Sequence, residues 1–184
     1  MLLMCATSSA QMKWNQSYQT YINQYKDLAI EQMLRYRIPA SITLAQGLFE
    51  SRAGQSDLVR QGNNHFGIKC HNWTGPTQYH DDDARGECFR VYQDAKESYE
   101  DHSRFLAKQP RYSRLFSLNT TDYKGWAHGL KSCGYATNPQ YANKLIQIIE
   151  LYRLQDYDKA KSYDRFMATH SGTDVPINAE GTLH

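Results

Sequence analysis

The stretch covering residues 38–54 constrains the fold most, because it carries no charged side chain before Glu50. Pro39 suits the start of a helix, where its missing N–H group removes no hydrogen bond. At about 100° per residue, the side chains divide into an apolar face and an uncharged strip. The face consists of Ile42, Ala45, Leu48 and Phe49 with Leu44 at its edge, and the strip of Thr43, Gln46, Gly47 and Glu50. We expect a short, mostly buried helix that ends near Gly54.

Glu50 is the first charged residue of this helix, and we expect it in the last turn. The exposed carbonyl groups there form the negative end of the helix dipole, and apolar neighbours remove water from the carboxylate. Both effects raise the pKa of a carboxyl group, and a carboxyl group that keeps its proton near neutral pH can act as a general acid. The alternative is a solvated glutamate at a helix end, the common environment of this residue type.

The length and charge of the chain exclude several classes of partner. With 184 residues it suits one domain and can bury a core. Its 21 Lys and Arg residues nearly balance 19 Asp and Glu residues, so the net charge of +2 gives no electrostatic reason to expect nucleic acid. No apolar run approaches the roughly 20 residues of a membrane span. We therefore expect no nucleic acid partner, no membrane span and a monomeric protein.

The first ten residues and the cysteines indicate the compartment. Residues 1–10 resemble the end of a secretory signal, because a short apolar run is followed by small residues; the alternative is an ordinary chain terminus. The prediction is an exported protein, periplasmic or extracellular. In such a compartment disulfides persist, and we expect one between Cys70 and Cys88, at the ends of a hairpin lobe. Cys133 is then unpaired unless it competes for one of them.

Hydrophobic periodicity predicts an α+β fold that is mainly helical, with one small β-hairpin lobe. The expected strands are 77–80 and 87–92, on either side of a turn at 83–86. The expected helices, besides that of Glu50, are 14–37, one from Asp94 to before Pro110, 121–132, and one from Asn138 to about 154. Residues 56–63 form a polar segment without a predicted helix. The domain thus covers 14–154, and 155–184 form a loosely held tail.

A helix-borne acid that faces a polar hairpin forms a cleft with carboxyl groups on both sides. The hairpin tip supplies Asp81, Asp82, Asp83 and Glu87. Two carboxyl groups that flank a bond, one protonated and one ionised, are the pair needed for glycoside hydrolysis. The alternative is that the aspartates only solvate a loop, and because neighbours on a strand alternate sides, one or two can face inward.

A metal site is the other chemistry that this region suggests. Its candidate ligands are His65, Cys70, His71, His80 and Cys88. Their spacing matches no compact zinc pattern such as paired C-x-x-C units, and the chain has no phosphate loop or dinucleotide fingerprint. We therefore expect no metal and no other cofactor.

Four motifs in this order resemble a known family. They are Ile38-Pro39-Ala40-Ser41-x-x-Leu44-Ala45-Gln46-x-x-x-Glu50-Ser51, Asn63-Asn64-His65-Phe66-Gly67-Ile68-Lys69, Phe89-Arg90-x-Tyr92 and Gly134-Tyr135-Ala136-Thr137-Asn138-Pro139-x-Tyr141-Ala142. Over about residues 20–154 the chain is similar to the bacterial glucosaminidases of glycoside hydrolase family 73, which act on peptidoglycan. The resemblance implies a lysozyme-like fold and cleavage of the β-1,4 bond after N-acetylglucosamine.

The resemblance also implies roles for individual residues. Glu50 matches the general acid of the family, and Tyr135 matches the tyrosine that lines its catalytic cleft. The chain departs from the family pattern in two places: Arg52 replaces a usual glycine, and the hairpin region 80–83 lacks the second acid, a glutamate. An aspartate, Asp83 or Asp82 by position, would have to serve instead, either to activate water or beside a substrate whose N-acetyl group assists.

The leading hypothesis is therefore an endo-β-N-acetylglucosaminidase that binds peptidoglycan glycan strands. Aromatic rings with polar edges suit a groove that stacks on sugars, although packing is their more common role. The substrate-binding residues we expect are Gln46, Asn64, Phe66, Lys69, Trp73 and Tyr141. Muramidase or lytic transglycosylase action on the same glycan is the enzymatic alternative, and a cell-wall-binding module without turnover is the alternative from another class.

Overall fold

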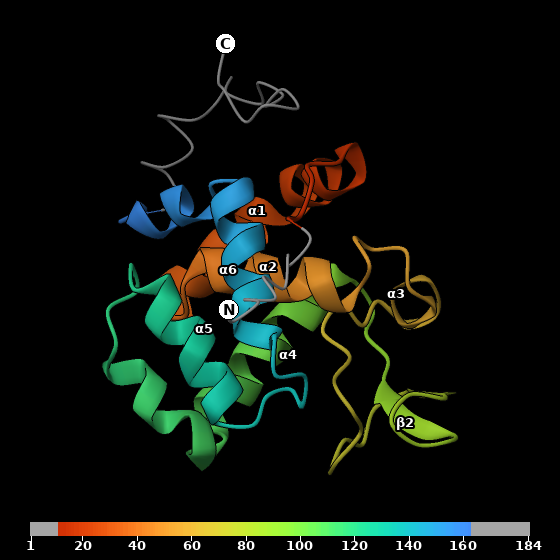
Figure 1. Ribbon diagram of the computed structural model, residues 1–184. Coiled ribbons are helices and arrows are strands. Elements are labelled where there is room, and N and C mark those ends of the chain that lie inside the picture. Colours follow the sequence, from red (N-terminus) through yellow and green to blue (C-terminus); the bar gives the residue numbers. More distant parts are fainter. Residues whose placement is uncertain (1–10, 163–184) are drawn as a thin grey trace, which may run out of the picture.

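The computed structural model describes residues 11–162 of the chain (Figure 1). The predicted signal segment 1–10 and most of the predicted tail lie outside the described residues. The elements in chain order are α1 (Gln16–Tyr36), α2 (Ala40–Glu50), α3 (Asp57–Gly62), β1 (Thr77–His80), β2 (Glu87–Arg90), α4 (Ala95–Lys108), the 3₁₀ helix η1 (Pro110–Ser117), α5 (Tyr123–Ser132), α6 (Tyr141–Leu151) and the 3₁₀ helix η2 (Leu154–Lys159). The α+β prediction, mainly helical with one hairpin, is confirmed.

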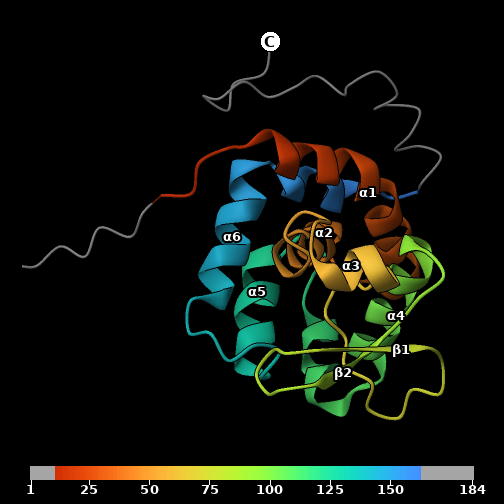
Figure 2. The same ribbon diagram turned by 90° about the vertical axis from the view of Figure 1, so that its right-hand side faces the viewer.

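Helix α2 lies at the centre of the helical body, where it contacts α1, α5, α6 and η2 (Figure 2). Every residue from Ala40 to Leu48 is buried, as the uncharged sequence predicts. Around it the core contains large apolar and aromatic side chains from every helical layer. The largest fully buried ones are Trp126, Tyr99, Tyr112, Tyr141, Phe89, Ile22, Ile30, Ile38, Ile42, Leu44, Leu48 and Leu106. The helix is held on all sides, so its C-terminal end is fixed in space.

Helix α2 ends at Glu50, one turn before the predicted end near Gly54. The reason is the backbone that follows, because Arg52, Ala53 and Gly54 all have positive φ angles of 51°, 55° and 78°. Left-handed residues cannot continue a right-handed helix. The hydroxyl of Ser51 accepts the Gly54 N–H at 2.8 Å and closes this turn. Glu50 is therefore the last helical residue.

The hairpin forms a separate lobe on one side of the helical body (Figure 1). Strands β1 and β2 pair antiparallel in one register, in which Gln78 faces Phe89. The predicted disulfide between Cys70 and Cys88 is present, with a Cα–Cα distance of 5.4 Å, and the Cys70 N–H also donates to the Cys88 carbonyl at 2.9 Å. Cys133 is a free cysteine.

The structure differs from the sequence prediction at several shorter elements. Residues 57–62, predicted as a polar segment, form α3, which the Ser56 hydroxyl caps at its N-terminus. The last helix starts at Tyr141 rather than Asn138, whose side chain instead accepts the Gln140 N–H at 2.8 Å. The predicted tail begins inside η2, which packs against α2. Within residues 11–162, no helix combines the length and the apolar character needed to cross a membrane.

Candidate active site

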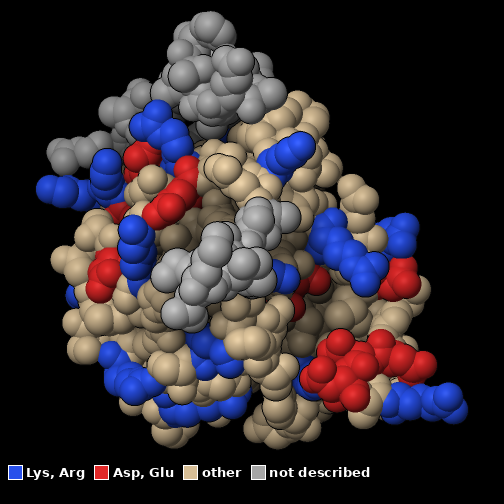
Figure 3. Space-filling view, in the orientation of Figure 1, with Lys and Arg blue, Asp and Glu red and all other residues tan. Residues whose placement is uncertain are grey.

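A cleft of about 420 Å³ separates the C-terminal end of α2 from the hairpin tip. Its lining residues come from α2, the loop before β1, the hairpin tip, α4, η1 and the loop before α6. They are Phe49, Glu50, Phe66, Gly67, Ile68, Lys69, His71, Asp82, Asp83, Phe105, Arg111, Tyr112, Gly134, Tyr135, Ala136, Thr137, Asn138 and Tyr141. Figure 3 shows acidic side chains gathered over the hairpin, beside a hollow in the surface. The cleft thus brings together segments that lie about 90 residues apart in the chain.

Glu50 enters this cleft as a half-buried side chain at the end of α2. Burial, and to a smaller extent the negative charge of Asp82, raises the pKa of its carboxyl group from 4.5 to about 7. A hydrogen bond from the Tyr141 hydroxyl opposes this rise, because it stabilises the carboxylate. The carboxyl group therefore keeps a proton near neutral pH, the state that a general acid needs.

A chain of buried hydrogen bonds supports Glu50 from below. The Nε2 atom of Gln46 donates to the Tyr141 hydroxyl at 3.0 Å, and its Oε1 atom lies 3.1 Å from Nε2 of His102. Since Oε1 can only accept, His102 donates through Nε2. Burial lowers the pKa of His102 to about 3, so its ring is neutral. The order is therefore His102 to Gln46 to Tyr141 to Glu50, with every donor matched to an acceptor.

Tyr135 and Tyr141 form the aromatic wall of the cleft. Their rings stack with centroids 5.8 Å apart and an interplanar angle of 23°. Burial, together with the nearby charge of Glu50, raises the pKa of the Tyr135 hydroxyl well above its usual value. Tyr135 therefore stays a neutral O–H donor beside the acid. Gly134, with a φ of 80°, makes the left-handed turn after α5 that brings Tyr135 to this wall.

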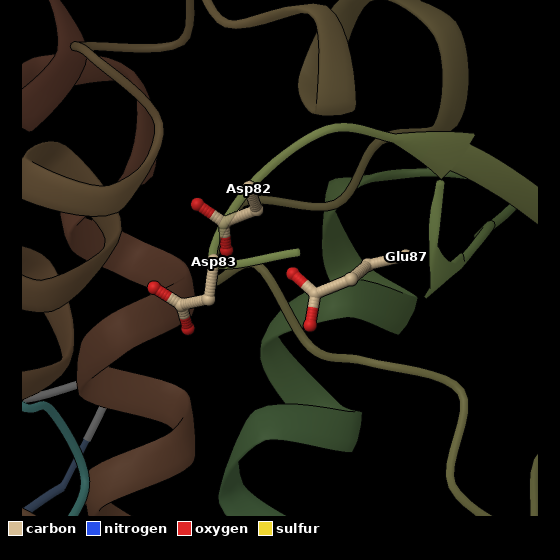
Figure 4. A group of neighbouring side chains, drawn as sticks. All are labelled: Asp82, Asp83 and Glu87. Atoms are coloured by element: carbon tan, nitrogen blue, oxygen red, sulfur yellow. The ribbon is translucent and has the colours of Figure 1, made fainter. Parts of the chain in front are cut away.

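The opposite wall is the acidic tip of the hairpin. Figure 4 shows Asp82 and Asp83 at this tip, with the Glu87 side chain reaching toward Asp83. Carboxylate oxygens of these three residues lie within 4.8 Å of one another. The Nζ atom of Lys69 donates to Asp83 at 3.2 Å and to Glu87 at 2.8 Å. An ammonium group thus already occupies the position of a cation among these acids, while Asp82 has no ion pair among residues 11–162.

Three of the predicted substrate-binding residues do not reach the cleft surface. Gln46 is 0% exposed, and its side chain is hydrogen-bonded to both Tyr141 and His102. Asn64 is 1% exposed, donates to the carbonyl groups of Ile68 and Arg90 at 3.0 and 2.9 Å, and accepts the Ile68 N–H at 3.0 Å. Trp73 is absent from the lining, because its ring packs on Tyr92 with centroids 5.7 Å apart. Gln46 and Asn64 are thus buried supports of the site, and Trp73 packs on Tyr92 and beneath the Arg90 guanidinium group, whose carbon lies 5.1 Å from its ring centroid.

The other predicted site residues do meet in the cleft, namely Glu50, Phe66, Lys69, Asp82, Asp83, Tyr135 and Tyr141. The structure adds His71, Phe105, Arg111 and Asn138 to them. His71 appeared in the sequence only as a rejected metal ligand, and Arg111 stands in no motif. Arg111 lies at the start of η1, and only the folded chain brings it into the cleft lining together with the loop before α6.

Comparisons with known proteins show the family of the chain. The family pattern described as mannosyl-glycoprotein endo-beta-N-acetylglucosaminidase matches residues 26–154. The exo-glucosaminidase LytG of Bacillus subtilis is 35% identical in an alignment of 136 residues that covers 68% of this chain and 48% of LytG. The peptidoglycan hydrolase FlgJ of Salmonella typhimurium is 32% identical over 139 residues, covering 68% of this chain and 43% of FlgJ. The chain thus spans a little under half the length of these relatives.

Solved structures share the fold as well. The catalytic domain of the autolysin Auto from Listeria monocytogenes has a TM-score of 0.66 at 30% identity, over 80% of this chain and 91% of that one. The glycoside hydrolase domain of Salmonella typhimurium FlgJ has a TM-score of 0.62 at 26% identity, over 83% of this chain and 98% of that one. The chain has the lysozyme-like fold of these domains and belongs to the glucosaminidase family, glycoside hydrolase family 73.

Proposed function

We propose that the protein hydrolyses the glycan strands of peptidoglycan, as an endo-β-N-acetylglucosaminidase that cuts the β-1,4 bond after N-acetylglucosamine. The observation that carries this proposal is the position of Glu50 in the cleft, where its carboxyl group has a pKa raised to about 7 and Asp82 lines the opposite wall. Membership of the glucosaminidase family and the peptidoglycan hydrolases among its relatives support the choice of polymer. Because this polymer lies outside the cytoplasmic membrane, we place the action of the protein there.

In the proposed reaction, Glu50 donates its proton to the leaving glycosidic oxygen as the bond breaks. Positive charge then develops on the sugar ring, as expected for glycoside hydrolysis. We assign Asp82 to stabilise this charge or to orient the attacking water, since Asp83 is held by Lys69 and Asp82 is not. An N-acetyl group of the substrate that assists in place of a protein nucleophile remains the alternative for this second step.

The walls of the cleft position the sugar. Tyr135 presents its ring and a neutral hydroxyl next to the acid, and Phe66 backs the site from beneath, stacked on His102 with centroids 3.9 Å apart. Aromatic faces of this kind pack against the apolar faces of sugar rings. Glu50 and Asp82 both come from one chain, so we propose a monomer as the active form.

Purified sacculi digested with the wild type and with Glu50→Gln test the proposal. The substitution keeps the shape of the side chain and removes its proton, so release of soluble fragments is expected to fall at least 100-fold. Glu150→Gln, which changes an exposed glutamate on α6, is the matched control. The released fragments should carry N-acetylglucosamine at their reducing ends. Reducing N-acetylmuramic acid or an anhydro-sugar would instead identify a muramidase or a lytic transglycosylase.

The same preparations decide whether the protein is only a wall-binding module. Sedimentation of the variant with sacculi measures binding without turnover. Retained binding by Glu50→Gln, with lost release, is the result expected of an enzyme. Equal and negligible release by wild type and variant would show a binding module.

The second carboxyl group has its own test. Asp82→Asn is expected to lower kcat by one or two orders of magnitude, because the charge facing Glu50 is lost. Asp83→Asn also removes a hairpin carboxylate, but one that is bonded to Lys69. It is expected to cost less than tenfold. Equal effects of the two substitutions would count against the assignment of Asp82.

A further inference from the structure

One side of the cleft is lined by basic residues. Lys69, His71 and Arg111 all line the cleft, and the charge of Arg90 also acts on His71. Two of the cations are compensated, since Lys69 is bonded to Asp83 and Glu87 and Arg90 forms an ion pair of 2.9 Å with Asp101. The charge of this side therefore depends on Arg111.

Arg111 has no carboxylate partner among the described residues. Its guanidinium carbon lies 4.7 Å from the ring centroid of Tyr112, and the side chain is exposed to the cleft. Stacking on an aromatic face holds the plane of the guanidinium group while its N–H groups stay available for a bidentate acceptor. Its charge also acts on Tyr135, which places it close to the reacting part of the cleft.

His71 stands beside this cation in a strained conformation. Its φ of 45° is in the left-handed region, which is costly for a residue with a Cβ atom, and it directly follows the disulfide-bonded Cys70. Its ring stacks on Phe105 with centroids 6.0 Å apart and an interplanar angle of 28°. Burial and the neighbouring cations lower its pKa, so near neutral pH it offers one N–H donor without charge. The two side chains form a positively charged pocket with several donors.

A neutral glycan offers no counter-charge to such a pocket. Chitin and peptidoglycan both contain β-1,4-linked N-acetylglucosamine, but peptidoglycan also carries a peptide stem on alternate sugars, and the stem bears carboxylates. We propose that Arg111, with His71, binds a stem-peptide carboxylate and so selects stem-bearing glycan over a neutral glycan such as chitin. This inference rests on the proposed function for its substrate class.

Binding to an inactive background tests the inference independently of turnover. The probes are a disaccharide-peptide fragment of peptidoglycan with free stem carboxylates and the same fragment with those carboxylates amidated. Glu50→Gln is expected to bind the free acid about tenfold more tightly, the value of a charge-assisted hydrogen bond at an exposed site. Glu50→Gln combined with Arg111→Ala should bind both probes alike, and combined with Arg111→Lys it should recover part of the difference.

Arg114→Ala is the matched control, because Arg114 is an exposed arginine on the same 3₁₀ helix that contacts Ser132 at 2.6 Å and is not in the cleft lining. In that background the preference for the free acid should persist. Absence of a preference in Glu50→Gln alone, or a preference that survives Arg111→Ala, would overturn the inference. Wild type that releases no reducing ends from sacculi would instead refute the glycosidase proposal, while the binding comparison would still decide the role of Arg111.

Discussion

The carboxylate of Asp158 caps helix α2 from a position 117 residues later in the chain. Its Oδ1 atom accepts the Ser41 N–H at 2.8 Å, and its Oδ2 atom accepts the Ser41 hydroxyl at 2.5 Å. Pro39, the residue at the N-cap position, offers no side-chain cap of its own. Asp158 is 4% exposed, so water does not replace it. An acid thus lies at each end of α2. Asp158 is buried and caps the N-terminal end, whereas Glu50 is half-buried and lines the cleft at the C-terminal end.

Replacement of the cap should weaken the whole domain. Asp158→Ala leaves a buried N–H and a buried hydroxyl without acceptors, which costs about 2 kcal/mol and lowers the Tm by roughly 4 to 8 °C. Asp158→Asn keeps an acceptor for the Ser41 N–H and should lose less than half as much. Thermal unfolding followed by circular dichroism measures both. Equal Tm values for the wild type and Asp158→Ala would show that the cap contributes nothing.

Truncation of the chain within η2 should also destabilise the domain, because it removes the Asp158 cap of α2. The family match ends at residue 154, before Asp158. A chain that ends after residue 154 therefore lacks the cap and the packing of η2 on α2, and it is expected to unfold at a lower temperature than one that ends after residue 162. The longer truncation is the control, since it keeps these contacts. Indistinguishable unfolding of the two would contradict a structural role for η2.

Local sequence patterns were sufficient to predict the central helix and its acid. The uncharged run before Glu50, the helix start at Asp94 and the turn before β2 each depend on a few neighbouring residues, and all three appear in the structure. The early end of α2 was not predictable in this way, because Arg52 and Ala53 adopt left-handed angles that their residue types disfavour. Local propensity does not contain that information.

The predicted substrate-binding residues also show that local sequence does not reveal contacts between remote parts of the chain. Gln46 and Asn64 stand in motifs and have polar side chains, so they resemble ligands of a substrate. Their partners are His102 and the carbonyl group of Arg90, which only the folded chain brings near. Asp158 was assigned to a tail because its partner Ser41 is equally remote. Sequence thus predicted which residues gather at the cleft better than it predicted which of them face it.

The pH dependence of stability should carry the signature of Glu50. Its pKa is about 7 in the folded state against an ordinary 4.5. Between these values the Glu50 carboxyl group binds more protons in the folded state than in the unfolded state, so its contribution to the free energy of unfolding falls as pH rises through this window. The shift corresponds to on the order of 3 kcal/mol, at about 1.4 kcal/mol per unit. Glu50→Gln should therefore be more stable than the wild type above pH 7, with the difference vanishing below pH 4.5.

Urea unfolding at pH 4.5 and pH 8 measures this difference. The pKa of Asp158 is also raised to about 7, mainly by burial, so Asp158 changes the stability in the same direction as Glu50. The stability of Glu50→Gln therefore still depends on pH through Asp158. Glu50→Gln combined with Asp158→Asn should remove the loss of stability with rising pH that both acids cause. Burial lowers the pKa of His65 to about 4 and that of His102 to about 3, so these histidines act in the opposite direction and each variant is compared with the wild type at the same pH. A stability difference between Glu50→Gln and the wild type that does not grow from pH 4.5 to pH 8 would contradict the raised pKa of Glu50.

The pH dependence of activity should respond to Tyr141. Its hydroxyl donates to the Glu50 carboxylate and so lowers the pKa of the acid. Tyr141→Phe removes this donor, and the alkaline limb of kcat/KM, which should lie near pH 7 in the wild type, is expected to move to higher pH. Tyr123→Phe is the control, because its hydroxyl binds Glu150 on the surface at 2.9 Å. An alkaline limb that stays in place in Tyr141→Phe would show that this hydrogen bond does not tune the acid.

The disulfide should matter more for the cleft than for the helical body. Cys70 and Cys88 close a segment with a sequence separation of 18, a loop whose constraint contributes about 3 kcal/mol at most. Both cysteines belong to the lobe that carries Asp82, whereas the core lies between the helices. Cys70→Ser combined with Cys88→Ser is therefore expected to lower kcat/KM at least tenfold while the helical circular dichroism signal at 25 °C is retained. Cys133→Ser, which changes the free cysteine of the described chain, should leave activity unchanged. Alkylation should label two more thiols in the wild type after reduction than before it. Full activity of the double variant would show that the disulfide does not maintain the geometry of the cleft.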